Sequence, residues 1–162
     1  MKQRLLLLLL LAGLLLAACA HGETTASPPE IRYGEDTCTH CNMIISDPRY
    51  AAGYAHEVSP GRYESLAFDD IGDLLADLGE QPERHIVAWY VHDYESEEWL
   101  DATTAYYVVS EQIISPMGHG IAAHATQAAA EQMAQANGGQ VYDWQALLAQ
   151  ANGLNHEATH HH

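Results

Sequence analysis

Two cysteines and a methionine lie close together in the segment TCTHCNMII, residues 37–45. They are Cys38, Cys41 and Met43, and His40 lies between the two thiols. Cysteines in this spacing serve three chemistries in proteins: thiol–disulfide exchange, structural zinc binding and the binding of a softer metal. The rest of the sequence has to discriminate among these three, and it must also supply the elements that position the sulfur atoms.

A redox pair of the thioredoxin kind begins a helix that follows a buried strand, where the helix dipole lowers the pKa of the thiol. Here the polar residues GEDT, 34–37, precede Cys38, and no apolar strand comes before them. In an oxidising compartment the default fate of two free cysteines is nevertheless a disulfide. A thiol–disulfide oxidoreductase that uses Cys38 and Cys41 therefore stays open as an alternative.

A structural zinc site requires four protein ligands. Cys38 and Cys41 provide two, so histidines would have to complete the site, and no suitable pair lies near a helix. His119 and His124 have a zinc-like interval, but they lie on a predicted strand.

Cu(I) accounts for more of the pattern, because it is soft, prefers thiolate and thioether ligands and accepts only two or three of them. Cys41 and Met43, at positions i and i+2, project from the same face of an extended chain. Cys38 converges on Cys41 if the chain turns between them, and Thr39, His40 and the following Asn42 are compatible with such a turn. Taken alone, Met43 would be interpreted as core filler before the following isoleucines.

Met117 favours the copper interpretation. It lies in SPMGHG between Pro116 and Gly118, where the backbone is expected to turn and burial of an apolar residue is disfavoured. Met133, by contrast, belongs to a predicted amphipathic helix. A loop methionine two residues from His119 is an unusual way to build a core and a reasonable way to build a soft-metal site.

The N-terminus has the pattern of a bacterial lipoprotein signal. Lys2 and Arg4 precede an apolar run, and the run ends in LLAAC at Cys19. The run is shorter than the roughly 20 residues that a membrane helix requires. We therefore predict a signal peptide over residues 1–18 and a lipid anchor on Cys19. Ala20, in place of aspartate, favours the periplasmic side of the outer membrane, with the inner membrane as the alternative.

Residues 19–33 are small, polar and proline-containing, which predicts a lipid-anchored tether. The net charge is −16 for the whole chain, and it becomes −18 once the two basic residues of the signal are lost. No lysine remains, which excludes nucleic acid and anionic lipid headgroups as partners. The acidity is either a solubility or salt adaptation or a modest means of concentrating cations.

The elements after the cysteines follow the order strand, strand, helix, strand. The alternating and amphipathic patterns predict strands at Tyr50–Val58, Tyr63–Phe68 and His85–Tyr94 and a helix at Asp69–Gly79. We expect Asp69 to be the N-cap of this helix and Phe68 to lie in the core. Neither Asp69 nor Asp70 is expected to bind the metal, because carboxylates are hard donors.

The same order occurs again in the second half. It comprises a long strand at Trp99–Ser110, a turn at Ser115–Gly118, a short strand over 118–125, a helix capped by Thr126 and ended by Gly138, and a last segment at Val141–Leu148. The last segment fits either a strand or the start of a helix. We predict an α+β fold of two ββαβ units, 34–95 and 96–155, packed as one body and followed by a disordered tail, 156–162.

Six motifs occur in order along the chain: a lipobox, C-x-x-C-x-M-x-I, F-D-D, W-Y-V-x-D, D-A-x-x-A-x-Y-V and P-M-G-x-G. After the lipobox, their residues are Cys38, Cys41, Met43 and Ile45; Phe68 to Asp70; Trp89 to Val91 and Asp93; Asp101, Ala102, Ala105, Tyr107 and Val108; and Pro116 to Gly118 with Gly120. In this combination the chain resembles the NosL family of nitrous oxide reductase accessory lipoproteins. The match covers nearly the whole mature chain, which makes it specific although each motif alone is weak.

The resemblance implies a membrane-anchored Cu(I) carrier that feeds the copper centres of nitrous oxide reductase and works with an ABC-type maturation complex. It implies a fold of two ββαβ units and copper contacts from Cys41, Met43 and Met117. Cys38 and His119 are further candidate donors.

The chain departs from the family pattern at three places. His40 lies between the two cysteines. Asn42 stands where the family commonly has glycine, and it tolerates the left-handed conformation that glycine would supply. Asp73 lies in a region where some relatives carry a cysteine.

The sequence contains no recognisable nucleophile, base and orienting partner and no phosphate loop, so we expect a protein that is not an enzyme. Besides the oxidoreductase, the remaining alternative is a lipid-anchored interaction module with a structural disulfide and no metal.

Overall fold

The computed structural model describes residues 23–158. The predicted signal peptide, the lipidation site Cys19 and residues 159–162 lie outside the described residues. Within the described part, no helix is both long enough and apolar enough to cross a membrane.

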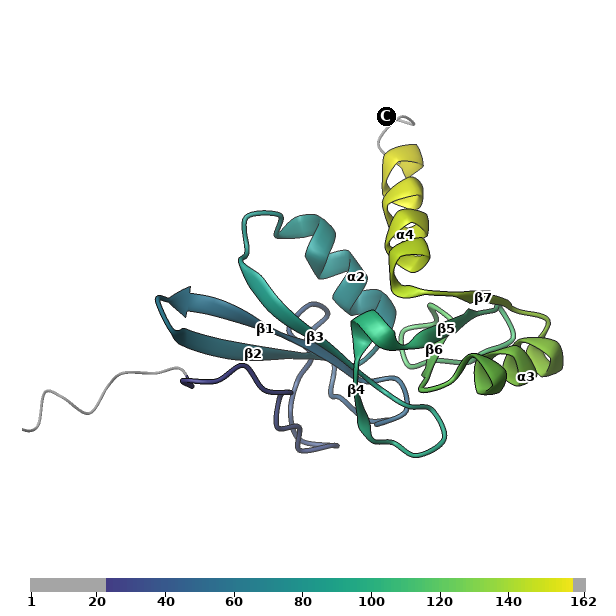
Figure 1. The fold of residues 1–162 in the computed structure, drawn as a ribbon, viewed down its shortest axis with the longest axis horizontal. Coiled ribbons are helices and arrows are strands. Elements are labelled where there is room, and N and C mark those ends of the chain that lie inside the picture. The colour runs from purple at the N-terminus through teal and green to yellow at the C-terminus, as the bar shows by residue number, and fades with distance from the viewer. Residues whose placement is uncertain (1–22, 159–162) are drawn as a thin grey trace, which may run out of the picture.

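The first half of the chain forms a four-stranded antiparallel sheet (Figure 1). Its strands are β1 (Ala52–Ser59), β2 (Arg62–Phe68), β3 (Ile86–His92) and β4 (Trp99–Asp101), in the order β2-β1-β3-β4. Helix α2 (Ile71–Glu80) connects β2 to β3. The central strand β1 pairs with both β2 and β3, so Tyr54 lies between Leu66 and Trp89.

The second half forms a three-stranded antiparallel sheet in the order β6-β5-β7. Its elements are β5 (Tyr106–Val109), β6 (Ile121–His124), α3 (Gln127–Asn137), β7 (Gln140–Tyr142) and the final helix α4 (Trp144–Ala158). Both halves therefore contain the order strand, strand, helix, strand, which confirms the predicted α+β fold of two ββαβ units.

The two sheets form one body (Figure 1). Their side chains share the larger of two hydrophobic clusters within residues 23–158, in which Phe68 and Leu74 of the first half pack with Tyr107 and Trp144 of the second. A backbone hydrogen bond of 2.8 Å from the Tyr94 N–H to the Ala123 carbonyl joins the end of β3 to β6. The predicted packing of the two units against each other is thus confirmed.

The long strand predicted at Trp99–Ser110 is divided in the structure. Its first part, β4, joins the first sheet, a 3-10 helix η2 (Ala102–Thr104) follows, and β5 joins the second sheet. The break is built by Asp101, whose side chain accepts hydrogen bonds from the N–H and the hydroxyl of Thr103 at 2.8 and 2.7 Å. The second predicted unit therefore contributes its first strand to the first sheet.

The segment at Val141–Leu148 begins as strand β7 and continues as helix α4. The Asp143 carboxylate accepts from the Ala146 N–H at 2.8 Å and so satisfies a donor of the first turn of α4. This helix ends at Ala158, inside the segment 156–162 that is predicted to be disordered.

The part of the predicted tether that the structure describes is packed on the first sheet. Glu23 pairs with Tyr63 of β2 through backbone hydrogen bonds of 2.8 and 2.9 Å, and the Ser65 hydroxyl donates to the Ser27 carbonyl at 2.6 Å. Pro29 is buried against Gly53, whose missing side chain leaves space for the proline ring. Residues 23–33 of the predicted tether are therefore held against the first sheet, because the edge of β2 offers partners to this polar segment.

The N-cap of α2 is Asp70, which corrects the prediction of Asp69. The Asp70 carboxylate accepts from the Gly72 N–H at 2.8 Å. Asp69 instead accepts from the Ser46 N–H at 3.0 Å and so holds the chain that follows the cysteines. The sequence does not separate two adjacent aspartates, because either carboxylate can satisfy a helix N-terminus.

The first turn of α2 also contacts the segment 115–120. The Met117 N–H donates to Asp70 at 3.2 Å, and Nδ1 of His119 lies 3.4 Å from the same carboxylate. The imidazole of His119 occupies the space next to Gly72 where a Cβ atom would lie. Gly72 is therefore a packing requirement of this contact.

We predict that Gly72→Ala destabilises the fold by about 1–3 kcal/mol, the usual cost of overpacking. In a His119→Ala background the same substitution should stabilise by roughly 0.5–1 kcal/mol, because alanine is the better helix former. Urea unfolding of the four proteins measures both effects. If Gly72→Ala changes the free energy of unfolding equally with and without His119→Ala, the packing of His119 against Gly72 is contradicted.

Candidate metal centre

The cysteines lie in a closed turn that the backbone holds on both sides. The Cys38 N–H donates to the Met43 carbonyl at 2.8 Å, and the Asn42 N–H donates to the Cys38 carbonyl at 3.1 Å. Asn42 has a φ of 62°, which confirms that asparagine supplies the left-handed conformation at this position. The Thr39 N–H bonds to the Ala67 carbonyl at 2.9 Å, so the turn is also fixed to the end of β2.

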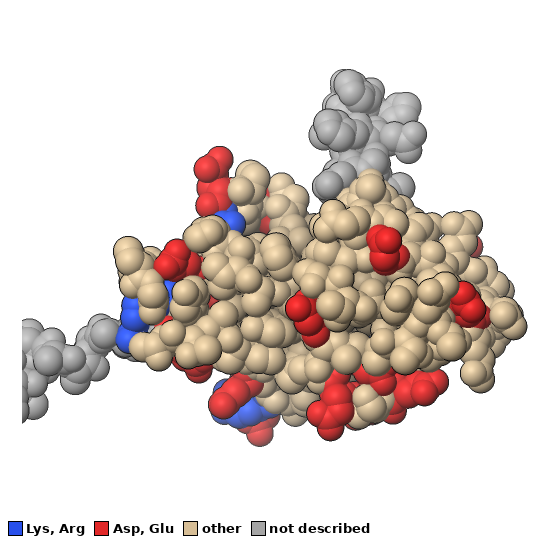
Figure 2. All heavy atoms as spheres, in the orientation of Figure 1, with Lys and Arg blue, Asp and Glu red and all other residues tan. Residues whose placement is uncertain are grey.

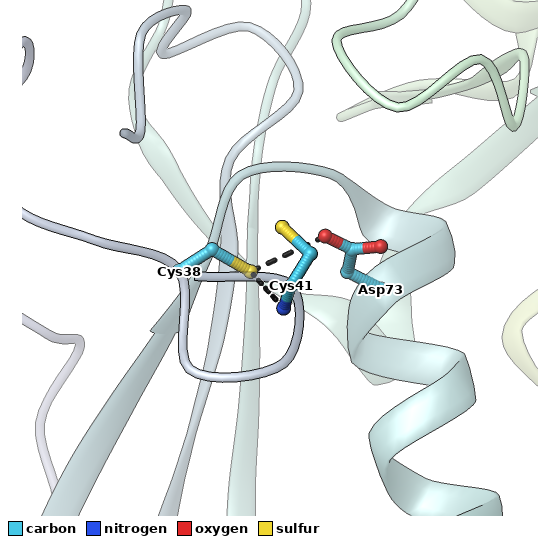
Figure 3. A group of neighbouring side chains, drawn as sticks. All are labelled: Cys38, Cys41 and Asp73. Atoms are coloured by element: carbon cyan, nitrogen blue, oxygen red, sulfur yellow. Dashed lines mark hydrogen bonds between the residues drawn. The ribbon is translucent and has the colours of Figure 1, made fainter. Parts of the chain in front are cut away.

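The two thiols meet at Asp73, in the first turn of α2 (Figure 3). Cys38 is only 1% exposed, and its thiol donates to Asp73 Oδ2 at 3.2 Å. The Cys41 N–H donates to Cys38 Sγ at 3.5 Å. The ligand atoms of these three residues all lie within 4.8 Å of one another, and both cysteines are free thiols.

Cys41 is held in its protonated form. Burial, together with a hydrogen bond to Asp73 and the proximity of Cys38, raises the pKa of the Cys41 thiol to about 12. A redox nucleophile shows the opposite shift, because it needs a thiolate at neutral pH. A metal ion that binds Cys41 as thiolate must displace this proton.

Asp73 was not among the predicted site residues. The apolar face of the helix pattern consists of Ile71, Leu74 and Leu75, and Asp73 is not part of it, so the pattern gave no reason to expect its burial. In the structure Asp73 is 3% exposed, because the cysteine turn covers this side of α2. The only signal in the sequence was its position, in a region where some members of the resembling family carry a cysteine.

The two loop methionines share one surface hollow. Met43 and Met117 line it together with Asp69, although they are far apart in the sequence. Met43 is 57% exposed and Met117 is 37% exposed, so neither is a core residue. The structure thus brings together the two thioethers that the sequence had singled out, and it argues against the interpretation of Met43 as core filler.

His119 contacts Asp70 and Gly72 at the start of α2. The hydrogen bond to Asp70 outweighs burial and raises the pKa of His119. Burial would raise the pKa of Asp70, but bonds from His119, Ser115 and the Gly72 N–H outweigh it and lower that pKa. Among the described residues, the thiols cluster with Asp73 and not with His119.

Three aspartates at the N-terminus of α2 contact or lie next to the predicted donors. Asp73 contacts the thiols, Asp70 holds the backbone of Met117 and the ring of His119, and Asp69 lies in the hollow of the two methionines. The resulting donor set is rich in sulfur and has a single carboxylate next to the thiols. Such a set suits a soft metal ion and is poor for Ca²⁺ or Mg²⁺, which need several oxygen ligands.

Comparison with known proteins agrees with this chemistry. A family model described as NosL matches residues 31–151. The chain is 31% identical over 148 residues to the copper-binding lipoprotein NosL of Stutzerimonas stutzeri, an alignment that covers 83% of this chain and 75% of the relative. The crystal structure of the copper chaperone NosL from Shewanella denitrificans is similar, with a TM-score of 0.62 at 21% identity, over 74% of this chain and 93% of that chain.

At 21% sequence identity, the structural similarity to the copper chaperone NosL demonstrates that the two proteins share a fold. Neither relative is named as an enzyme, which agrees with the expectation that this chain is not one. The family match spans both sheets and all five predicted donor residues, and it confirms the resemblance found in the sequence motifs. The chain belongs to the NosL family.

Proposed function

We propose that this protein is a lipid-anchored Cu(I) chaperone that carries one copper ion between its cysteine turn and its methionine loop. Cys41, Met43 and Met117 would be its principal donors, and Cys38 would add a second thiolate. The observation that carries the proposal is the convergence of both sulfur-bearing segments on the first turn of α2.

The choice of Cu(I) follows from the thioethers. Two thiolates and a carboxylate would also suit zinc, but zinc does not use methionine, and Cu(I) does. Met43 and Met117 line the same hollow and are exposed, so they have no packing role that would explain them. Under this proposal His119 positions the methionine loop through Asp70 and does not bind copper.

The proposed donor residues differ in solvent exposure, and this difference would help the transfer of copper to a recipient. Cys38 is buried, Cys41 is half-buried, and both methionines are exposed. Ligands of a recipient can displace the weak, exposed thioethers while a thiolate still holds the ion. Copper can then move by ligand exchange without being released into solution.

Two exposed isoleucines flank the donors and supply a contact surface for a recipient. Ile44 is 52% exposed and Ile114 is 87% exposed, and both line the hollow of Met43 and Met117. Exposed apolar side chains around a functional site are typical of transient docking surfaces. We propose nitrous oxide reductase and its ABC-type maturation complex as the partners, so the delivered copper would build the copper centres of that enzyme.

The proposed location is the periplasmic side of the outer membrane, with Cys19 as the lipid anchor. The lipoprotein signal and Ala20 support it, as does the name of the relative, a copper-binding lipoprotein. Acidic groups far outnumber basic ones on the face drawn in Figure 2, in line with the net charge of −16. Such a field raises the local concentration of cations, an effect that falls with ionic strength.

A thiol–disulfide oxidoreductase is the competing function from another class. The raised pKa of Cys41 argues against this residue as the attacking thiol, and Cys38, the other candidate, is only 1% exposed and is inaccessible to a substrate disulfide. Reductase activity that persists when Met43 and Met117 are replaced by leucine, without copper binding, would favour this competitor.

We predict that Cys41→Ser weakens Cu(I) binding more than the roughly 10–100-fold typical of residues that only support metal ligands, whereas Met117→Leu, which removes a weaker thioether donor, weakens it within that range. The measurement is an anaerobic titration of the chain from residue 20, which contains every described element, against a chromophoric Cu(I) competitor. The C-terminal histidines are replaced by alanine in all proteins, so that weak binding there does not obscure the result.

Ile114→Leu is the matched control, because Ile114 lines the same hollow and offers no donor atom. It should bind Cu(I) as the parent does. Affinities for Cys41→Ser and Met117→Leu that equal the affinity of this control would contradict the proposed site.

Copper binding should also strengthen as pH rises. The pKa of Cys41 is raised to about 12, so its thiol is protonated throughout the neutral range and loses its proton when it ligates. For each proton released on binding, the affinity for copper rises about tenfold per pH unit. The release of one proton therefore gives a rise of roughly a hundredfold between pH 6 and 8, and the release of two protons gives roughly ten-thousandfold. Titrations across this range should show a shallower slope for Cys41→Ser, and a pH-independent affinity of the parent would refute thiolate ligation.

A further inference from the structure

A second pair of soft donors lies outside the thiol and methionine centre. His124, at the end of β6, faces Met133 of α3, and Nε2 of the histidine is 3.0 Å from the sulfur of the methionine. Both residues line a hollow of about 510 Å³ between α3 and the loops around Tyr94 and Ile113. Nothing in the proposed transfer at Cys41 and Met117 uses this pair.

The polar atoms of His124 are poorly satisfied by the protein. The residue is 1% exposed, and its Nδ1 atom has no hydrogen-bond partner. If Nε2 carries the proton, it donates to the weakly accepting thioether and leaves Nδ1 as an unpaired acceptor. If Nδ1 carries the proton, a buried donor is unpaired and the Nε2 lone pair faces sulfur. Either tautomer leaves a buried polar group unsatisfied, which native structures seldom tolerate without a ligand or another function.

We propose that His124 and Met133 form a second binding site for one soft monovalent metal ion, with the imidazole Nε2 and the thioether sulfur as its two donors. An ion between them replaces the weak contact of Nε2 with the thioether by two coordinate bonds and fixes the proton of the neutral ring on Nδ1. Cu(I) accepts two ligands of this kind.

The geometry needs only a small adjustment. With metal–nitrogen and metal–sulfur bonds of about 2.0 and 2.3 Å, as for zinc, a linear arrangement separates the donors by about 4.3 Å. The sulfur must therefore move by roughly 1 Å from its present position. Met133 is partly buried and has three rotatable bonds, so its side chain can make this movement without disturbing α3.

The charged surroundings suit a monovalent cation. Glu95 lines the hollow, and Asp93 faces the ring of His124 as a neighbouring carboxylate. Arg49 also lines the hollow, but its guanidinium is bound to Asp47 at 2.6 Å, and this ion pair offsets its charge. With no cysteine in the hollow, the second site should bind copper more weakly than the thiol centre.

The second site lies next to the first. Ile114 lines both the hollow of Met43 and Met117 and the hollow of His124 and Met133. The proposal nevertheless depends only on its own two donors, so it can fail or hold independently of the proposed function.

The test uses the chain from residue 20 with the first site removed by Cys38→Ser, Cys41→Ser, Met43→Leu and Met117→Leu and with the C-terminal histidines replaced by alanine. Anaerobic titration with Cu(I) should show one bound equivalent. Adding Met133→Leu should weaken this binding at least tenfold, whereas Gln132→Ala, in the same hollow, should leave it unchanged. No saturable equivalent, or equal affinity with and without Met133→Leu, would overturn the proposal.

A second measurement needs no substitutions, so it remains valid if the combined substitutions of the first test disturb the fold. In the unsubstituted chain with ¹³C-labelled methionine methyl groups, Ag(I) serves as a redox-inert probe of soft-metal sites. The methyl signals of Met43 and Met117 should shift with the first equivalent and that of Met133 with the second. A Met133 signal that does not move in excess Ag(I) would overturn the second site even if the first site binds.

Discussion

The carboxylate of Asp70 is fully buried, and a buried charge of this kind is stable only when hydrogen-bond donors surround it. The donors come from two directions: the Gly72 N–H of its own helix, and the Met117 N–H and the His119 ring of the loop between β5 and β6. The loop that carries the exposed methionine is therefore tied to the start of α2 by the same group that caps the helix. Any change that removes this carboxylate loses a cap and a loop contact together.

The neighbouring aspartates extend the same arrangement to the cysteine turn. Asp69 holds the Ser46 N–H just beyond the turn, and Asp73 accepts from the Cys38 thiol. Sulfur donors from two distant segments are thus placed around one helix terminus, with the thiols inside and the thioethers outside. In the proposed copper carrier, the buried thiols provide the affinity for copper and the exposed thioethers allow copper to leave.

The sequence could predict those features that depend on local pattern and residue type. Alternation and amphipathic periodicity identified the strands and helices, and Asn42 could be assigned a left-handed conformation because it stands where the resembling family commonly has glycine. Features decided by long-range contacts were missed. Asp73 is buried because a distant turn covers it, the segment 23–33 is packed because β2 has an open edge, and the strand at 99–110 breaks where Asp101 satisfies a new turn. For Asp73 and the segment 23–33 the deciding partner lies far along the chain. For Asp101, as for Asp69 and Asp70, the residue type fits two outcomes equally well, and the sequence does not choose between them.

The central claim is that one copper ion contacts both loops at once, and X-ray absorption spectroscopy of the Cu(I)-loaded protein tests it most directly. With copper below one equivalent and Met133→Leu present throughout, we expect a coordination shell made of sulfur, with at least three sulfur atoms at about 2.3 Å, the usual metal–thiolate distance. Met117→Leu should then remove one sulfur from the shell while the protein still binds copper. A shell dominated by nitrogen or oxygen, or a sulfur count that Met117→Leu leaves unchanged, would contradict a copper ion shared by the two loops.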